Sequence, residues 1–292
     1  MNKLSPGLTF TVLCGVSAVL WFRPLLDTFQ LAVSDERYTE IILILPLAAA
    51  LILRGWKGRR AAPQKWTAAG GILFTGLLVM VIARVGTARD SDIGLAVEMA
   101  ALVLWWIASF AFSFGLPTFR TFRFPLFFLL WMVPLPRIVM DPIVEGLQRG
   151  SILAAEFLFS ALRVPVSQEG ITIFIPGLDI AVTPDCSSIR SSLMLLVTTM
   201  LLAHVLLKSP WRKALVIAVA VPLSVAKNGL RIFTIGMLST RVDRTFLTGH
   251  LHRQGGIIFF MIALAGVFFV LWILRRGEGT PALPPQVSPA PL

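Results

Sequence analysis

Charged side chains are scarce in this sequence. Asp, Glu, Lys and Arg make up 14% of the 292 residues, whereas apolar residues make up 56%, and the mean hydropathy is +0.82. Soluble domains carry about a quarter charged residues, so this composition excludes a soluble protein. The sequence also has no internal repeat and no separate polar domain. It therefore predicts a polytopic membrane protein.

Cysteine and histidine are rare as well, with two and three residues. Cys14 lies in the first apolar stretch, where we expect it to pack, and Cys186 alone cannot form a disulfide framework. No H-E-x-x-H or C-x-x-C spacing is present, so we expect no zinc or other metal site and no cofactor. No small-residue cleavage site follows the first apolar stretch, so we do not interpret it as a signal peptide.

Eight apolar stretches are candidates for membrane spans. They cover about residues 8–22, 39–55, 66–84, 93–115, 124–140, 188–208, 213–238 and 255–274. The first is short, and the fifth contains the helix-breaking Pro134–Leu135–Pro136. The predicted fold is an all-α polytopic membrane protein with about eight transmembrane helices.

Basic clusters set the predicted orientation. The short loops on one side of the eight-span arrangement are nearly pure Lys and Arg, which by the positive-inside rule makes that side cytoplasmic. The clusters are Lys3, 54–65, Arg120 and Arg123, Lys208 to Lys213, and Arg275 and Arg276. Both termini are then cytoplasmic. The net charge of +11 would meet anionic membrane lipids, so nucleic acid is not an expected partner.

The outer side is predicted to hold residues 141–185 and 241–254. Its first part has helical apolar spacing and is expected at the membrane interface. The next part alternates apolar residues on either side of Pro176–Gly177, which predicts a β-hairpin leading into the helix of Cys186. At the other end, residues 277–292 are Pro-rich and are expected to form a disordered cytoplasmic tail. The predicted catalytic domain is then residues 1–276.

Cys186 stands at a predicted helix start, because Pro184 and Asp185 give an N-cap signal just before it. A thiol in a first helical turn feels the positive end of the helix dipole, which favours the nucleophilic thiolate. Arg190 lies four residues on and adds a second positive charge. The alternative is that Cys186 is only a small buried apolar residue.

Three further residues could complete a site with Cys186. Asn228 and Arg231 share one face of the seventh span, and an Arg inside a span costs about 2.5–3.5 kcal/mol at the bilayer centre. Arg231 is therefore expected to be a functional residue. The alternative is that it lies near a helix end and extends its guanidinium to the membrane interface. His250 and His252 are predicted in the short outer loop before the eighth span, although such surface histidines are often without function. His204 is expected to be structural.

Cysteine, arginine and histidine on one membrane face suit acyl transfer. The thiolate would attack a peptide carbonyl, the imidazole would protonate the leaving amine, and the guanidinium would stabilise the oxyanion.

At these residues the chain resembles the exosortase/archaeosortase family of membrane-embedded cysteine transpeptidases, over most of residues 35–262. Its cysteine motif is matched by Cys186 to Arg190, its Asn-Gly-hydrophobic-Arg motif by Asn228 to Arg231, and its histidine motif by His252, Gly256 and Phe259 to Phe260. Weaker matches are residues 35–47, 125–136 and 170–173. Ser188 departs from the glycine of many members, which leaves the recognised sorting signal open.

The resemblance implies a nucleophile at Cys186, a transition-state stabiliser at Arg231 and a general acid/base at His252, with Arg190 and Asn228 in support. It implies substrates that are secreted proteins with a C-terminal, Pro-Glu-Pro-like (PEP-CTERM-like) sorting tail, cut on the periplasmic face of a bacterial cytoplasmic membrane. It links the enzyme to exopolysaccharide biosynthesis and to the display of proteins at the cell surface. The resemblance does not identify the acceptor molecule. The alternatives are a non-enzymatic carrier or assembly factor for exopolysaccharide export, and a protease that hydrolyses without transfer.

Overall fold

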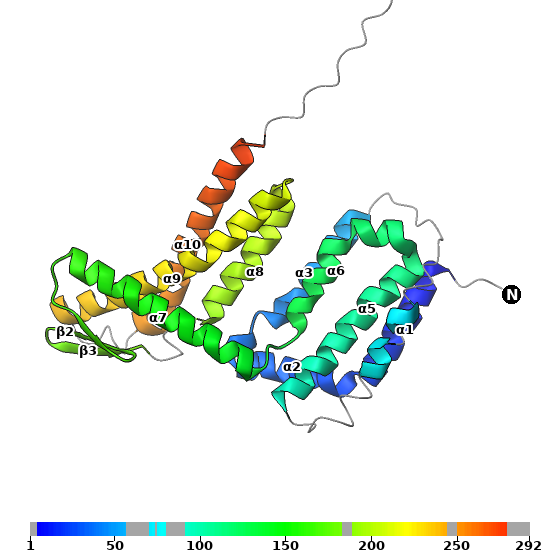
Figure 1. Cartoon of the computed structure of the whole chain (residues 1–292), viewed down its shortest axis with the longest axis horizontal. Helices are drawn as coiled ribbons and strands as arrows, with labels where there is room; N and C mark the ends of the chain where they lie inside the picture. Colours follow the sequence, from blue (N-terminus) through cyan, green and yellow to red (C-terminus); the bar gives the residue numbers. More distant parts are fainter. Residues whose placement is uncertain are drawn as a thin grey trace, which may run out of the picture. The chain divides into compact units, whose positions relative to one another are not determined.

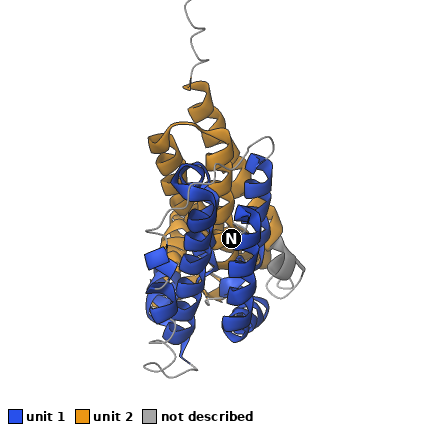
Figure 2. Ribbon diagram, turned by 90° about the vertical axis from the view of Figure 1, so that its right-hand side faces the viewer, with its two compact units in different colours: residues 1–146 blue, residues 147–292 orange. Residues whose placement is uncertain are grey.

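A computed structural model describes residues 5–56, 70–73, 75–79, 91–182, 189–243 and 250–278, with the backbone alone for 250–255. The chain divides into two compact units, Met1–Gly146 and Leu147–Leu292 (Figure 2). The predicted tail at 277–292 lies outside the described residues, except for its first two positions. That the two units serve as one catalytic domain stays a prediction.

The first unit is helical and is organised around one long helix, α5. Its elements in chain order (Figure 1) are α1 (Pro6–Leu20), α2 (Phe22–Ser34), the 3-10 turn η1 (Glu36–Tyr38), α3 (Ile41–Trp56), α5 (Asp92–Thr121), α6 (Arg123–Phe128), the 3-10 turn η2 (Leu129–Met132) and the start of α7 (Arg137–Ala161). Half of the residues of α5 are buried. Its regular geometry is interrupted at Gly115 (φ 79°, ψ 166°), two residues before Pro117.

Indole N–H groups bind α1 to α5. Trp105 donates to the carbonyl of Leu13 at 3.0 Å, and Trp106 donates to the hydroxyl of buried Ser17 at 2.9 Å. In the other direction, Trp21 at the end of α1 donates to the carbonyl of Glu98 at 2.9 Å. Tryptophan adds a large apolar surface to each of these bonds, so this helix pair is held by packing and by directional contacts.

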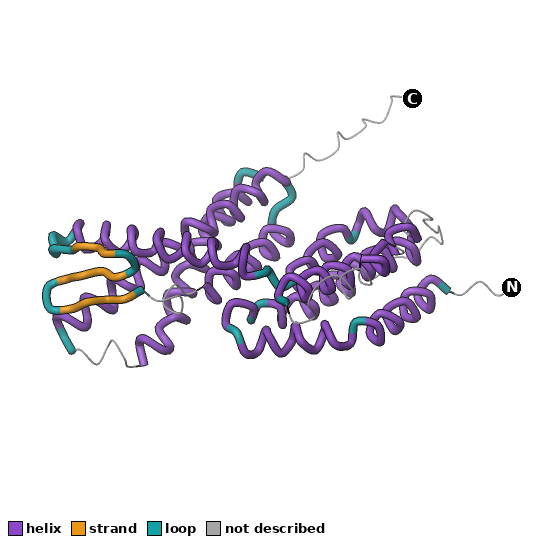
Figure 3. The backbone as a smooth tube through the Cα atoms, turned by 60° about the horizontal axis from the view of Figure 1, so that its bottom comes forward, coloured by secondary structure: helices purple, strands orange, loops and turns teal. Residues whose placement is uncertain are grey.

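The second unit joins a small sheet to three long helices. It contains the remainder of α7, then β1 (Ser167–Glu169), β2 (Thr172–Ile175), β3 (Leu178–Ala181), α8 (Ile189–Leu206), α9 (Pro210–Arg241) and α10 (His250–Arg276) (Figure 3). The predicted hairpin is present as β2 and β3, paired antiparallel around Pro176–Gly177, where Gly177 has φ 83°. The sequence did not predict β1, which pairs antiparallel with β2. The outer-face position of the sheet stays a prediction.

Buried apolar side chains attach the sheet to α7 and α9. The cluster combines Ile152, Ala155 and Phe159 of α7, Ile173, Ile175 and Val182 of the sheet region, and Ile232 of α9. A second cluster holds α8, α9 and α10 together through Leu195, Ala203, Leu207, Val216, Ala263, Val267 and Leu271. Burial of a side chain of this size is worth about 1.5–3 kcal/mol, so these contacts position the sheet on the helices.

The predicted count of eight spans is not confirmed. Among the described residues, five helices are long and apolar enough to cross a membrane, and counting each of two bent pairs as one span gives seven. The pair α1 and α2 bends by 74°, and the pair Arg123–Met132 and Arg137–Ala161 bends by 93°. The second bend falls at Pro134 and Pro136, which cannot donate a backbone N–H to a continuous helix. About half of the predicted third span, 66–84, lies outside the described residues.

The start of α9 and the end of α10 cap each other. The carboxylate of Glu278, just beyond α10, accepts the backbone N–H of Ser209 at 2.8 Å and that of Lys208 at 2.9 Å. In return, Arg212 donates to the carbonyls of Leu274 and Gly277 at 2.8 and 2.7 Å. The bonds from Ser209 and Lys208 lower the pKa of Glu278 below its ordinary value of 4.5.

We expect Glu278→Gln to lower the melting temperature in detergent at neutral pH, and we expect this difference to shrink as the pH falls below 4.5. A lowered carboxyl pKa in the folded state stabilises the fold above the unfolded-state pKa, and this contribution disappears as the pH falls through the folded-state pKa. Thermal unfolding of both proteins between pH 3 and 7 tests this. A constant difference across that range would show that the charge of Glu278 has no part in the cap.

Candidate functional site

The structure describes three of the five predicted site residues. Asn228 is buried and Arg231 half-buried on α9, and Arg190 is exposed in the first turn of α8. Cys186 and the side chain of His252 lie outside the described residues, so their roles stay predictions. The backbone corrects one expectation: α10 begins at His250, so His250 and His252 belong to its first turn instead of the preceding loop.

The Asn228–Arg231 segment lies at a close approach of α9 to α7. A Cβ atom on Gly229 would lie 2.5 Å from the Cβ of Ala154 and 3.0 Å from the backbone nitrogen of Ala155. One turn earlier, a Cβ on Gly150 would lie 3.0 Å from Val225. Steric constraint therefore explains why the second position of the Asn-Gly-hydrophobic-Arg motif is glycine, because only glycine lets the two backbones come this close.

The strand that leads toward Cys186 is anchored to α7. Buried Gln148 donates from Nε2 to the carbonyl of Val182 at 2.7 Å, and the N–H of Val182 donates to the carbonyl of Ile171 at 2.9 Å. Val182 is fully buried and is the last described residue before the cysteine segment. Both backbone groups of this residue are thus bonded, which fixes the point at which the chain leaves the sheet.

Polar groups are concentrated inside α9 next to the motif glycine. Asn228 is 1% exposed, and neither its Nδ2 nor its Oδ1 has a hydrogen-bond partner among the described residues. Leaving such a group unpaired costs about 1–3 kcal/mol. The preceding residue, Lys227, is 4% exposed and donates from Nζ to the hydroxyl of Ser191 in the first turn of α8. This stretch of α9 therefore faces the beginning of the helix that follows Cys186.

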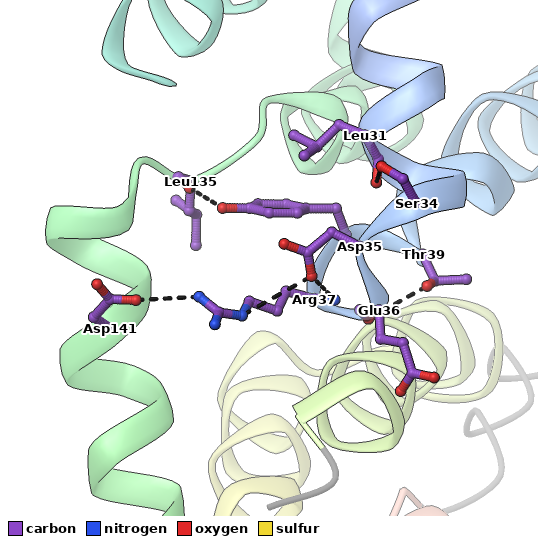
Figure 4. A network of polar contacts seen from close by, with 9 residues as sticks. Leu31, Ser34, Asp35, Glu36, Arg37, Thr39, Leu135 and Asp141 are labelled. Carbon is purple, nitrogen blue, oxygen red and sulfur yellow. Dashed lines mark hydrogen bonds and ion pairs between the residues drawn. The ribbon is translucent and has the colours of Figure 1, made fainter. Parts of the chain in front are cut away.

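A separate polar network lies in the first unit, at the start of the 35–47 segment (Figure 4). Arg37 on η1 donates to Asp141 at 3.2 Å and lies 3.9 Å from the carboxylate of Asp35. The hydroxyl of Tyr38 donates to the carbonyl of Leu135 at 2.8 Å, between the two prolines of the bend. These contacts border a cavity of about 310 Å³ lined by Leu31, Asp35, Arg37, Tyr38, Asp92, Arg137 and Asp141.

This network fixes the start of α7. Asp92, in the first turn of α5, accepts the N–H of Arg137 at 2.7 Å. The first residue of α7 is therefore bonded to α5, while Tyr38 holds the Leu135 carbonyl within the bend. The acidic segment at 35–47 thus has a structural role at the Pro134–Pro136 bend. Within the described part of the chain, no group of three His, Cys, Asp or Glu residues is placed to hold a metal ion.

The comparison with known families confirms the family resemblance. The family described as transmembrane exosortase matches residues 31–269, which is most of the chain. The protein belongs to the transmembrane exosortase family. No curated protein and no solved structure gives a significant match. This exosortase is accordingly a membrane-embedded protein with several apolar helices, and the matched range includes the Gly229 contact, the sheet and the polar network at the bend.

Two buried polar residues beside the predicted site segments, Lys227 and Gln148, were not predicted. Lys227 lies within an apolar span, so the free-energy cost of inserting a charged side chain into a membrane applies to Lys227 as it does to Arg231. The sequence therefore contained a signal for Lys227. Gln148 carried no such signal, because a glutamine on an amphipathic helix is ordinary and its partner is a backbone carbonyl 34 residues away.

We expect Gly229→Ala to destabilise the protein by about 1–3 kcal/mol, the usual range for an inserted methyl group in a packed core. The measurement is thermal unfolding in detergent. Gly256→Ala is the matched control, because it adds the same methyl group to a helical glycine of another exosortase motif where a Cβ would meet nothing within 4 Å. An equal loss of stability in both variants would contradict the steric role of Gly229.

Proposed function

We propose that this exosortase is a cysteine transpeptidase that removes a C-terminal sorting tail from secreted proteins and transfers them to an acceptor. The active site would lie on the periplasmic face of a bacterial cytoplasmic membrane, where the tail's own membrane helix is held among lipids. The supporting observation is that the chain is anchored on both sides of Cys186, at Val182 by Gln148 and at Ser191 by Lys227.

The two anchors limit where Cys186 can be. A fully extended chain spans at most about 3.6 Å per residue, so the Cα of Cys186 is within roughly 14 Å of that of Val182 and 18 Å of that of Ser191. Because Ser191 contacts Lys227, this range includes the α9 segment that carries Asn228 and Arg231. The anchors thus support a shared site for the predicted nucleophile and Arg231.

The first half of the reaction forms an acyl-enzyme. The thiolate of Cys186 attacks the carbonyl carbon of the scissile peptide bond, and the guanidinium of Arg231 stabilises the resulting oxyanion. The intermediate then collapses: the C–N bond breaks, the sulfur keeps the acyl group as a thioester, and His252 gives a proton to the leaving amine.

The second half returns the enzyme to its starting state. An acceptor amine or hydroxyl attacks the thioester, its proton passes to His252, and the thiolate of Cys186 leaves. Attack by water instead would make the enzyme a hydrolase. Arg190 and the carboxamide of Asn228 would support the site, the first through its charge near the thiolate and the second through its unpaired buried donor and acceptor. A Pro-Glu-Pro-like tail and a link to exopolysaccharide are part of this proposal.

We expect Cys186→Ala to reduce cleavage of a tail-bearing secreted reporter to background, because no other group replaces the nucleophile. Cys14→Ala is the matched control: Cys14 is the half-buried cysteine of α1, and its loss should leave the rate within about twofold. Immunoblots of reporter size, followed by mass spectrometry of the new C-terminus, separate transfer from hydrolysis. Normal processing by folded Cys186→Ala would exclude the mechanism and favour a carrier or assembly role.

We expect His252→Gln and His250→Gln to differ. Removal of a general acid should slow acyl transfer by about 10²–10⁴-fold and flatten the pH dependence near neutrality, and the exosortase motif points to His252. The pH–rate profile of each variant with a synthetic tail peptide in detergent decides between them. If His250→Gln loses the neutral titration and His252→Gln keeps it, the assignment is reversed.

A further inference from the structure

Lys227 is a buried cation that the reaction above does not use. Its side chain is 4% exposed, and it lies well inside the candidate span Pro210–Arg241. A lysine in an apolar span is costly unless it is paired or functional. A buried lysine of this kind therefore requires either a partner that neutralises its charge or a function in which the positive charge takes part.

The contacts of Lys227 do not neutralise it. Its ammonium has three N–H donors, and the acceptor recorded for it is the neutral hydroxyl of Ser191. Within the described part of the chain, Lys227 forms no ion pair. The two acids on the elements packed against α9 in this unit, Glu156 on α7 and Asp179 on β3, are not bonded to it.

The other charged and titratable groups around α9 are mostly basic. On α9 itself, Arg231 follows Lys227 by four residues and so shares its face. The described side chains on the elements packed against α9 add Arg190 and His204 on α8, Arg149 on α7, and Arg275 and Arg276 on α10. The Lys227–Arg231 turn thus has positive charge and the unpaired carboxamide of Asn228, an arrangement that favours a negatively charged group.

We propose that Lys227 is a further functional residue of this site, whose buried ammonium stabilises the negative charge of the Cys186 thiolate. The proposal rests on the proposed function, in which Cys186 is the nucleophile. Ser191 follows Cys186 by five residues in the sequence, and Lys227 bonds to Ser191, so the ammonium is held at the start of α8. A charge in a poorly solvated interior acts more strongly and over a longer range than one in water. Lys227 is a charge-stabilising residue and acts through Cys186.

The test measures the ionisation of Cys186 without any sorting tail. In the Cys14→Ala background, the only remaining cysteine is Cys186, and the rate of its alkylation by neutral iodoacetamide between pH 5 and 10 gives its apparent pKa. We expect Lys227→Met to raise that pKa by about one unit, which slows alkylation about tenfold at pH values below it. Lys227→Arg keeps the charge and should stay within about threefold of the parent.

Ser191→Ala separates charge from structure, because it removes the hydrogen bond and leaves the ammonium in place. We expect it to change the apparent pKa of Cys186 by much less than Lys227→Met does. Equal shifts in the two variants would overturn the proposal and make Lys227 a structural link between α8 and α9. An unchanged pH profile of Cys186 alkylation in folded Lys227→Met would also overturn the proposal. If KM for a tail peptide rose in that variant while the profile stayed unchanged, Lys227 would bind substrate instead.

Two further arms keep the test decisive. If Lys227→Met does not fold, Lys227→Gln takes its place, and the comparison with Lys227→Arg still isolates the charge. The proposed function fails separately, through normal reporter processing by Cys186→Ala, whereas the alkylation profile needs no substrate and reports on the thiolate alone.

Discussion

The direct approach of the α7 backbone to that of α9 at Gly229 is the contact on which the second unit depends. With no side chain between them, Ala154 and Ala155 rest against the motif segment itself, and the larger residues on either side bury the sheet. The same helix then provides Gln148, whose amide holds the strand end at Val182. One steric requirement thus positions Asn228, the sheet and the entry to the cysteine segment together.

Polar contacts within each unit are placed where the backbone changes direction. In the first unit, Tyr38 binds the backbone within the Pro134–Pro136 bend, and Asp92 binds it directly after the bend. In the second unit, Gln148 binds the end of the sheet, and Lys227 binds the beginning of α8. Isolated hydrogen bonds of this type are worth about 1 kcal/mol each. Their value here is geometric, since they fix chain segments that regular helices alone would leave undetermined.

Local signals explain which parts of this architecture the sequence predicted. Hydropathy located the spans corresponding to α3, α5, α8, α9 and α10, and alternation around Pro176–Gly177 located the hairpin. The anchor at Gln148 depends on a partner 34 residues away, which periodicity does not record. The strand β1 pairs with the neighbouring β2, but its three residues are polar and exposed, so no apolar alternation marks it. Lys227 lies one residue before the Asn-Gly-hydrophobic-Arg motif and is not part of it, although a charge within a span is itself a local signal.

The break in α5 at Gly115 determines how much of that helix can cross a bilayer. From Asp92 to Phe114 the helix rises about 35 Å at 1.5 Å per residue, close to the roughly 30 Å hydrocarbon thickness of a typical membrane. The positive φ of Gly115 ends this straight segment before Pro117 and Arg120. A continuous helix to Thr121 would exceed that thickness and require strong tilting. Gly115 therefore matches the length of the buried central helix to the membrane.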